Sequence, residues 1–129
     1  MGLNIYTSKS IMKILNINHI SLHVKNLEKS IEFYRRLGLK QLPRPDFDFE
    51  GAWLTLGPQQ LHLIVGREKE IFNDSRGVHY ALTVDSIEVA EEWLINQNIK
   101  FRPPKTRAGG VIQIFLKDPD GYLLELTEG

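Results

Sequence analysis

The sequence contains a second copy of part of itself, and this repeat restricts the possible folds more than any other feature. Residues 18–40 match residues 78–100 at a constant offset of 60, which pairs His19 with His79. The same offset pairs Gly38 with Asn98, two residue types that tolerate the left-handed backbone conformation at the end of a helix. We infer that the chain consists of two copies of one structural module.

Each copy begins with a strand pattern followed by a helix pattern. Ile20, Leu22 and Val24 alternate with polar residues, which is typical of a half-buried strand. Asn26 and Ser86 then occupy positions where helix N-caps are expected. The strands predicted after the helices are 39–42, 52–56 and 60–65 in the first copy and 99–102, 111–116 and 122–127 in the second. The sequence therefore predicts an α+β fold of two βαβββ modules.

The length of 129 residues fits one domain with a substantial core, but not two ordinary domains. We expect residues 1–13 to be an N-terminal extension and residues 14–129 to form the single domain. Module 1 covers about 14–66, the polar stretch 66–77 links the modules, and module 2 covers about 78–129. Residues 103–110, rich in proline and glycine, are expected to form a loop that covers a site.

The charge balance and the residue content exclude several functional classes. Sixteen basic and sixteen acidic residues give no net charge, so neither nucleic acid nor an anionic membrane is an expected partner. The chain has no cysteine, which excludes disulfides and thiolate ligands. Its apolar runs are only strand-sized, and its N-terminus lacks the apolar core of a signal peptide. We therefore predict a cytoplasmic protein that acts on a small-molecule substrate.

Metal-competent side chains occur at equivalent points of the two copies. His19 and His79 open the first strands, while His62 and Glu125 lie in the last strands, where a longer turn changes the offset to 63. Imidazole and carboxylate donors suit Zn, Ni, Mn, Co or Fe(II), and three protein ligands leave positions open for substrate. We predict that His19, His79 and Glu125 bind a divalent metal ion. His62 is either a fourth ligand or a polar residue lining the cleft.

Four further residues are candidates for the substrate pocket. Trp53 belongs to a strand that should border the cleft, and His23 shares a strand face with His19. Arg102 and Arg107 could bind an anionic substrate, although solvated surface charge is the alternative interpretation. Residues 44–51 mix aromatic and acidic side chains and could border the mouth of the cleft.

The paired modules, the histidine that opens each one and the closing DPDGYLLEL resemble the glyoxalase/bleomycin resistance/extradiol dioxygenase superfamily, also called vicinal oxygen chelate. This resemblance implies a curved mixed sheet around a metal-binding cleft. It assigns the ligand positions to His19 in INHISLHV, His79 in GVHYALTV and Glu125 in LLELTE. Because a second chain completes the cleft in many two-module members, the resemblance also implies a homodimer.

The same resemblance implies a metal-dependent enzyme, with lyase or isomerase proton transfer favoured and Glu125 as ligand and base. Glyoxalase I resembles this chain but has a glutamate at the position of His62, whose imidazole could ligate or act as a catalytic base. A fosfomycin-type thiol transferase and an extradiol-type dioxygenase are alternatives. A metal-free binding protein of the bleomycin resistance type is an alternative from another class.

Overall fold

A computed structural model describes residues 11–66 and 70–129. The greater part of the predicted N-terminal extension, residues 1–10, lies outside the described residues, as do residues 67–69 of the predicted linker. In the part of the chain that is described, no helix is long and apolar enough to cross a membrane.

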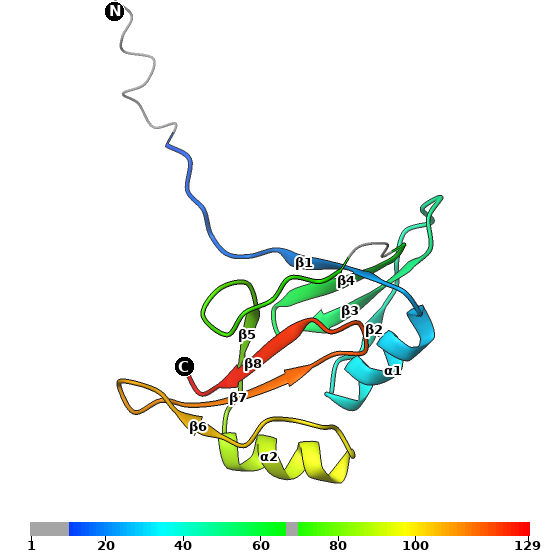
Figure 1. Ribbon diagram of the computed structural model, residues 1–129. Coiled ribbons are helices and arrows are strands. Elements are labelled where there is room, and N and C mark those ends of the chain that lie inside the picture. The colour runs from blue at the N-terminus through cyan, green and yellow to red at the C-terminus, as the bar shows by residue number, and fades with distance from the viewer. Residues whose placement is uncertain (1–10, 67–69) are drawn as a thin grey trace, which may run out of the picture.

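The two predicted modules are present, each with the order βαβββ (Figure 1). The elements of module 1 are β1 (His19–Val24), α1 (Leu27–Arg36), β2 (Gln41–Leu42), β3 (Gly51–Leu56) and β4 (Gln59–Val65). Those of module 2 are β5 (Tyr80–Thr83), α2 (Ile87–Asn96), β6 (Lys105–Thr106), β7 (Ile112–Lys117) and β8 (Leu123–Thr127). The predicted α+β fold class is confirmed.

Strand pairing repeats the same pattern in both modules. The sheets have the orders β1-β4-β3-β2 and β5-β8-β7-β6, and the first pair in each is parallel while the others are antiparallel. Ser21 pairs with His62 in module 1, and Ala81 pairs with Glu125 in module 2. Since His62 and Glu125 occupy the same register position, the sequence offset of 63 corresponds to a true structural equivalence.

The helices begin and end at the predicted residues. The side chains of Asn26 and Ser86 accept hydrogen bonds from the Lys29 and Val89 amides, at 3.1 and 3.2 Å, and so satisfy donors that the first helical turn leaves free. At the other ends, Gly38 (φ 106°) and Asn98 (φ 58°) take up the left-handed conformation. The pairing of glycine with asparagine in the repeat therefore reflects matching backbone geometry.

One strand of module 2 was misplaced by the sequence analysis. The predicted strand 99–102 was wrong, because the paired residues are Lys105 and Thr106, opposite Gln113 and Ile112. Residues 103 and 104 are both proline and have no amide hydrogen to donate, so regular pairing resumes only after them. The predicted loop 103–110 thus contains strand β6.

The two modules share one apolar core, to which α1 contributes the buried Phe33 and α2 the buried Leu94. Polar contacts also join the modules. The Tyr34 hydroxyl of α1 lies 2.6 Å from Asp118 Oδ2 and 2.8 Å from the Tyr80 hydroxyl, and Trp93 of α2 donates to the Arg36 carbonyl. These contacts hold helix α1 of module 1 against β5, α2 and the β7–β8 turn of module 2.

Candidate functional site

Module 1 brings two of the predicted ligands into direct contact. His19 and His62 come from the adjacent parallel strands β1 and β4, and their rings stack with centroids 4.1 Å apart. His62 also stacks on Trp53 of β3, its partner in the strand register, at 4.2 Å and an interplanar angle of 3°. The apolar residues Leu22 and Val24 point the other way, into the core. This half-site is therefore a row of three stacked rings.

Neighbouring amide side chains orient these imidazoles. Asn18 Oδ1 lies 2.8 Å from His19 Nδ1, and Gln60 Oε1 lies 2.9 Å from His62 Nε2. An amide oxygen can only accept, so His19 Nδ1 and His62 Nε2 are the donors in these contacts, and the other nitrogen of each ring is not used by them. Burial, and then the nearby charges of His19 and Arg44, lower the pKa of His62 below its ordinary value. The lowered pKa favours the neutral form of His62, which a metal ligand or a base requires.

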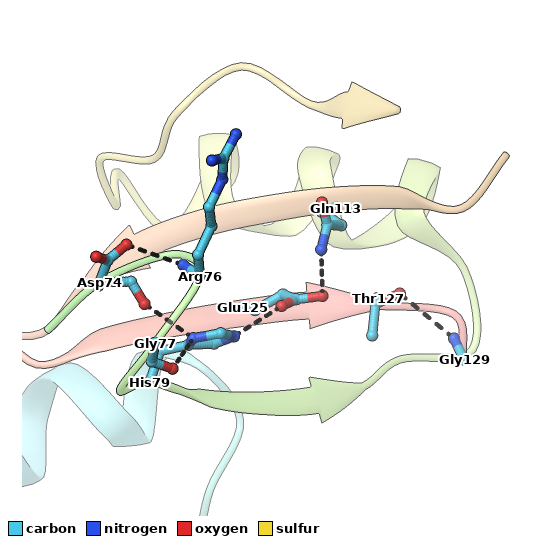
Figure 2. Close-up of polar contacts among 8 residues, drawn as sticks. All are labelled: Asp74, Arg76, Gly77, His79, Gln113, Glu125, Thr127 and Gly129. Atoms are coloured by element: carbon cyan, nitrogen blue, oxygen red, sulfur yellow. Dashed lines mark hydrogen bonds and ion pairs between the residues drawn. The ribbon is translucent and has the colours of Figure 1, made fainter. Parts of the chain in front are cut away.

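Module 2 brings together the other two predicted ligands. His79, in the turn just before β5, places Nε2 3.0 Å from Glu125 Oε1 of β8, and Gln113 of β7 donates to Glu125 Oε2 at 2.9 Å. Figure 2 shows His79 between this carboxylate and the turn at Asp74 and Gly77, whose carbonyl oxygens each lie 3.1 Å from its Nδ1. Glu125 is only 7% exposed. The carboxylate is therefore buried and oriented from two sides.

The hydrogen-bond partners of His79 are all acceptors. Both carbonyls at Nδ1 and the carboxylate at Nε2 are acceptors, whereas a neutral imidazole carries only one N–H. A shared proton accounts for the 3.0 Å contact between Nε2 and Oε1, and a metal ion bound by both atoms could take its place. Two donors that bind one ion at about 2.0–2.2 Å stand roughly 3 Å apart, which matches the observed 3.0 Å. This donor pair fits a divalent metal.

The two half-sites remain separate within one chain. Among residues 11–66 and 70–129, no three His, Asp or Glu side chains lie close enough to hold one ion. The structure unites His19 with His62, and His79 with Glu125, but does not bring His19 to His79. The joint site stays a prediction that a single copy of the chain does not test.

The predicted substrate-pocket residues are distributed unequally. Trp53 lies in the module 1 half-site, and the exposed His23 lies on the same face of β1 as His19. Arg102 lies over the ring of Phe115, 5.8 Å from its centroid, and that ring packs edge-on against His79. Arg107 instead donates to the Ala108 carbonyl within its own turn. Arg102 is thus close to a half-site, whereas the contacts of Arg107 are local.

Gln60 and Gln113 were missed by the sequence analysis. Gln60 of β4 bonds His62, two residues further along the same strand. Gln113 of β7 bonds Glu125 on the neighbouring strand β8. Strand register alone could have suggested Gln60, two residues before His62 on the same face, but glutamine at such positions is common. Gln113 lies two residues from Phe115, the register partner of Glu125, so its contact crosses the strand pair diagonally and the sequence carries no pattern for it.

One groove of the molecule lies elsewhere. It has a volume of about 660 Å³ and is lined mainly by apolar residues of both modules, including Leu39, Leu56, Val89 and Trp93. None of the four predicted ligands lines it. Because these walls offer no imidazole or carboxylate donor pair, the two half-sites are the better candidates for chemistry.

Two βαβββ modules with imidazole and carboxylate donors at equivalent strand positions define a paired-module α+β protein with a candidate metal site. The chain belongs to the Glyoxalase/Bleomycin resistance protein/Dioxygenase superfamily, whose sequence model matches residues 16–126. This membership confirms the resemblance inferred from the sequence.

Named relatives agree with this assignment. The chain is 29% identical over 126 residues to lactoylglutathione lyase of Escherichia coli O157:H7, covering 88% of this chain and 93% of the relative. It is 29% identical over 124 residues to Glyoxylase I 4 of Arabidopsis thaliana, covering 89% and 71%. The crystal structure of a glyoxalase family protein from Bacillus anthracis superposes with a TM-score of 0.76 at 25% identity, covering 91% and 97%. The names of the relatives support an enzymatic role at a coarse level.

Proposed function

We propose that the chain is a metal-dependent enzyme with lyase or isomerase activity whose site forms between two copies of the chain. His19 and His62 of one copy would bind the ion together with His79 and Glu125 of the other. Single chains bring these donors together only in pairs, and each pair lies on the sheet face opposite the core. Relatives named lactoylglutathione lyase favour lyase chemistry over the thiol transferase and dioxygenase alternatives.

The observation that carries this proposal is the acceptor-only environment of His79. A buried carboxylate at Nε2 and two carbonyls at Nδ1 create a position for a cation, and the 3.0 Å spacing suits two ligands of one ion. Carbonyl partners at Nδ1 also fix the tautomer that presents Nε2 to a metal, an arrangement that supports metal-ligating histidines.

The chemistry of the remaining groups follows from their surroundings. A divalent ion held there would act as a Lewis acid toward two neighbouring substrate oxygens. Gln113 fixes Oε2 of Glu125 and leaves Oε1 to face the ion or a substrate proton. With His62 Nε2 bonded to Gln60, its Nδ1 can either bind the ion or accept a proton, and the lowered pKa favours the neutral ring that either role needs. Both groups are therefore candidates for proton transfer.

Metal content and subunit mass provide the first test. We expect elemental analysis of the untagged, chelator-free protein to show bound divalent metal, and mass measurement in solution to show a dimer. His79→Ala/Glu125→Gln should lose the metal, while His23→Ala, which removes an exposed histidine from β1, should keep it. A wild-type protein that takes up no Zn, Mn, Ni, Co or Fe(II) would instead support the metal-free binding protein.

A mixed dimer tests where the site forms. The double substitution His19→Ala/His62→Ala removes both predicted ligands of module 1, and His79→Ala/Glu125→Gln removes both of module 2. Neither homodimer should then bind metal tightly. A heterodimer of the two variants, isolated with two different tags, would combine one intact module 1 with one intact module 2. We expect about one ion per heterodimer, half the wild-type content. No metal in the heterodimer would show that the site is not shared between chains.

A further inference from the structure

The row of stacked rings at the module 1 half-site continues beyond Trp53. Phe47 lies 6.0 Å from Trp53, and Phe49 stacks on Phe47 at 5.0 Å and 24°. Together with the stacking of Trp53 on His62, these contacts form one series of rings that ends at a predicted metal ligand. We call Phe47, Phe49 and Trp53 the aromatic wall.

Two members of the aromatic wall are exposed although they are apolar. Phe47 and Phe49 remain 42% and 44% exposed, while the core phenylalanine Phe33 is only 6% exposed. Burial of apolar surface stabilises a protein by about 25 cal/mol for each Å², and these exposed rings lack that stabilisation. Exposed adjacent apolar rings beside a candidate metal half-site mark a surface suited to binding a ligand.

Arg44 holds the wall in a preformed arrangement. Its guanidinium lies 4.8 and 4.9 Å from the ring centroids of Phe47 and Phe49, and it donates to the Phe49 carbonyl at 2.9 Å. Gly51 allows this close approach, since a Cβ there would lie 3.1 Å from Arg44 Nη2 and collide with the Leu63 carbonyl. The rings therefore need little reordering before they bind a ligand.

Charge around the wall limits the kind of ligand. The exposed acidic residues Asp46, Asp48 and Glu50 alternate with the two phenylalanines, and Arg44 is already engaged with the rings and with a backbone carbonyl. A substrate with an anionic tail, such as a glutathione thioether, would meet like charge here. An uncharged planar ring would gain stacking contacts without that repulsion.

We propose that the aromatic wall binds the uncharged aromatic ring of a substrate whose two neighbouring oxygens face the His19–His62 half-site. This inference rests on the proposed function, because it is the bound ion that would hold those oxygens. The substrate class is then an aryl compound with vicinal oxygens rather than a short aliphatic one carried on an anionic thiol.

Paired hydroxamates test the ring separately from the metal. Benzohydroxamate and acetohydroxamate present the same two oxygens and differ in the aromatic ring. For the metal-loaded full-length protein, titration calorimetry should show benzohydroxamate bound about tenfold more tightly, as expected for one or two aromatic contacts. Phe47→Leu/Phe49→Leu should remove most of this preference while acetohydroxamate affinity is kept. Phe72→Leu, at a phenylalanine outside the wall that is 81% exposed, is the matched control and should keep the preference.

The outcomes separate the two proposals. If acetohydroxamate binds but the preference for the ring is the same in wild type and Phe47→Leu/Phe49→Leu, the aromatic wall has no such role and the metal proposal stands. If neither hydroxamate binds to the protein after metal loading, the proposed function fails and the inference with it. Because the ratio is compared between variants, the intrinsic difference between the two chelators cancels.

Discussion

At the scale of single residues, the candidate site depends on side chains that orient its ligands. Gln113 donates to Glu125 Oε2, two backbone carbonyls face His79 Nδ1, and Asn18 and Gln60 each face one imidazole of module 1. Each partner reduces the orientations that a ligand can adopt before the ion arrives. Such supporting contacts commonly change metal affinity by 10- to 100-fold, as is known for metal sites in general.

We predict that Gln113→Leu weakens metal binding by about 10- to 100-fold with little change in fold stability. The substitution removes the donor to Oε2 and lets the carboxylate rotate, but leaves all four predicted ligands in place. Competition with a chromogenic chelator would measure the affinity. Gln41→Leu, on the short strand β2, is the matched control and should bind metal like the wild type. Equal affinities in the two variants would contradict a positioning role for Gln113.

The ligand candidates could be predicted from the sequence, but their supporting residues could not. His19 and His79 occupy equivalent points of the repeat, and so do His62 and Glu125. The repeat itself therefore indicated these four residues as ligand candidates. Gln113 has no glutamine counterpart in module 1, because the strand register places Gly51 at the equivalent position. Phe47 and Phe49 belong to the mixed aromatic and acidic segment 44–51, to which the sequence analysis assigned no chemistry. Their ring contacts depend on how residues 43–50 fold back toward β3, which the sequence does not show.

At the scale of secondary structure, the repeat predicted where the helices end more accurately than where the strands lie. The match of Gly38 with Asn98 located two left-handed residues, and the structure contains both. Strand β6 was misplaced because a two-residue strand has almost no sequence pattern of its own. Its position depends on pairing with β7, which sequence periodicity does not describe.

We predict that Gly38→Ala destabilises the fold by about 1 kcal/mol or more. At φ 106° a Cβ is strained even though nothing lies within 4 Å of it, so the cost comes from the backbone and not from a clash. Urea unfolding followed by circular dichroism would measure the loss. Gly77→Ala is the control, because its backbone is not left-handed and its Cβ would meet the Asp74 Cβ at an ordinary 3.4 Å. A larger loss in Gly77→Ala would contradict this explanation.

At the scale of the whole molecule, a small polar cluster fastens one module to the other. Asp118 is 5% exposed, accepts a hydrogen bond from Tyr34 at 2.6 Å, and also accepts from the Asp120 and Tyr122 amides of its own turn. Tyr34 in turn contacts the Tyr80 hydroxyl. The turn DPDG could be predicted from its residues, but its contact with α1 could not, because packing between modules leaves no periodic pattern. The same carboxylate therefore stabilises its own turn in module 2 and contacts α1 of module 1.

The protonation of Asp118 should make module docking depend on pH. Burial raises the pKa of its carboxyl above the ordinary 3.8, although bonds from Tyr34 and two amides act in the opposite direction. A raised pKa means that the folded protein holds this proton more firmly than the unfolded chain does. The contribution of Asp118 is then greatest below pH 3.8 and declines as pH rises through the higher folded pKa.

Asp118→Asn removes this titration but keeps an oxygen for the two turn amides and a polar group facing Tyr34. We predict that wild type loses stability relative to Asp118→Asn as pH rises from below 3.8 toward neutrality, measured by urea unfolding at several pH values. Asp85→Asn, which removes an exposed carboxylate, is the matched control and should show a smaller trend. If wild type instead becomes more stable relative to Asp118→Asn over this range, the hydrogen bonds to Asp118 lower its pKa by more than burial raises it. The carboxylate would then stabilise the contact between the modules.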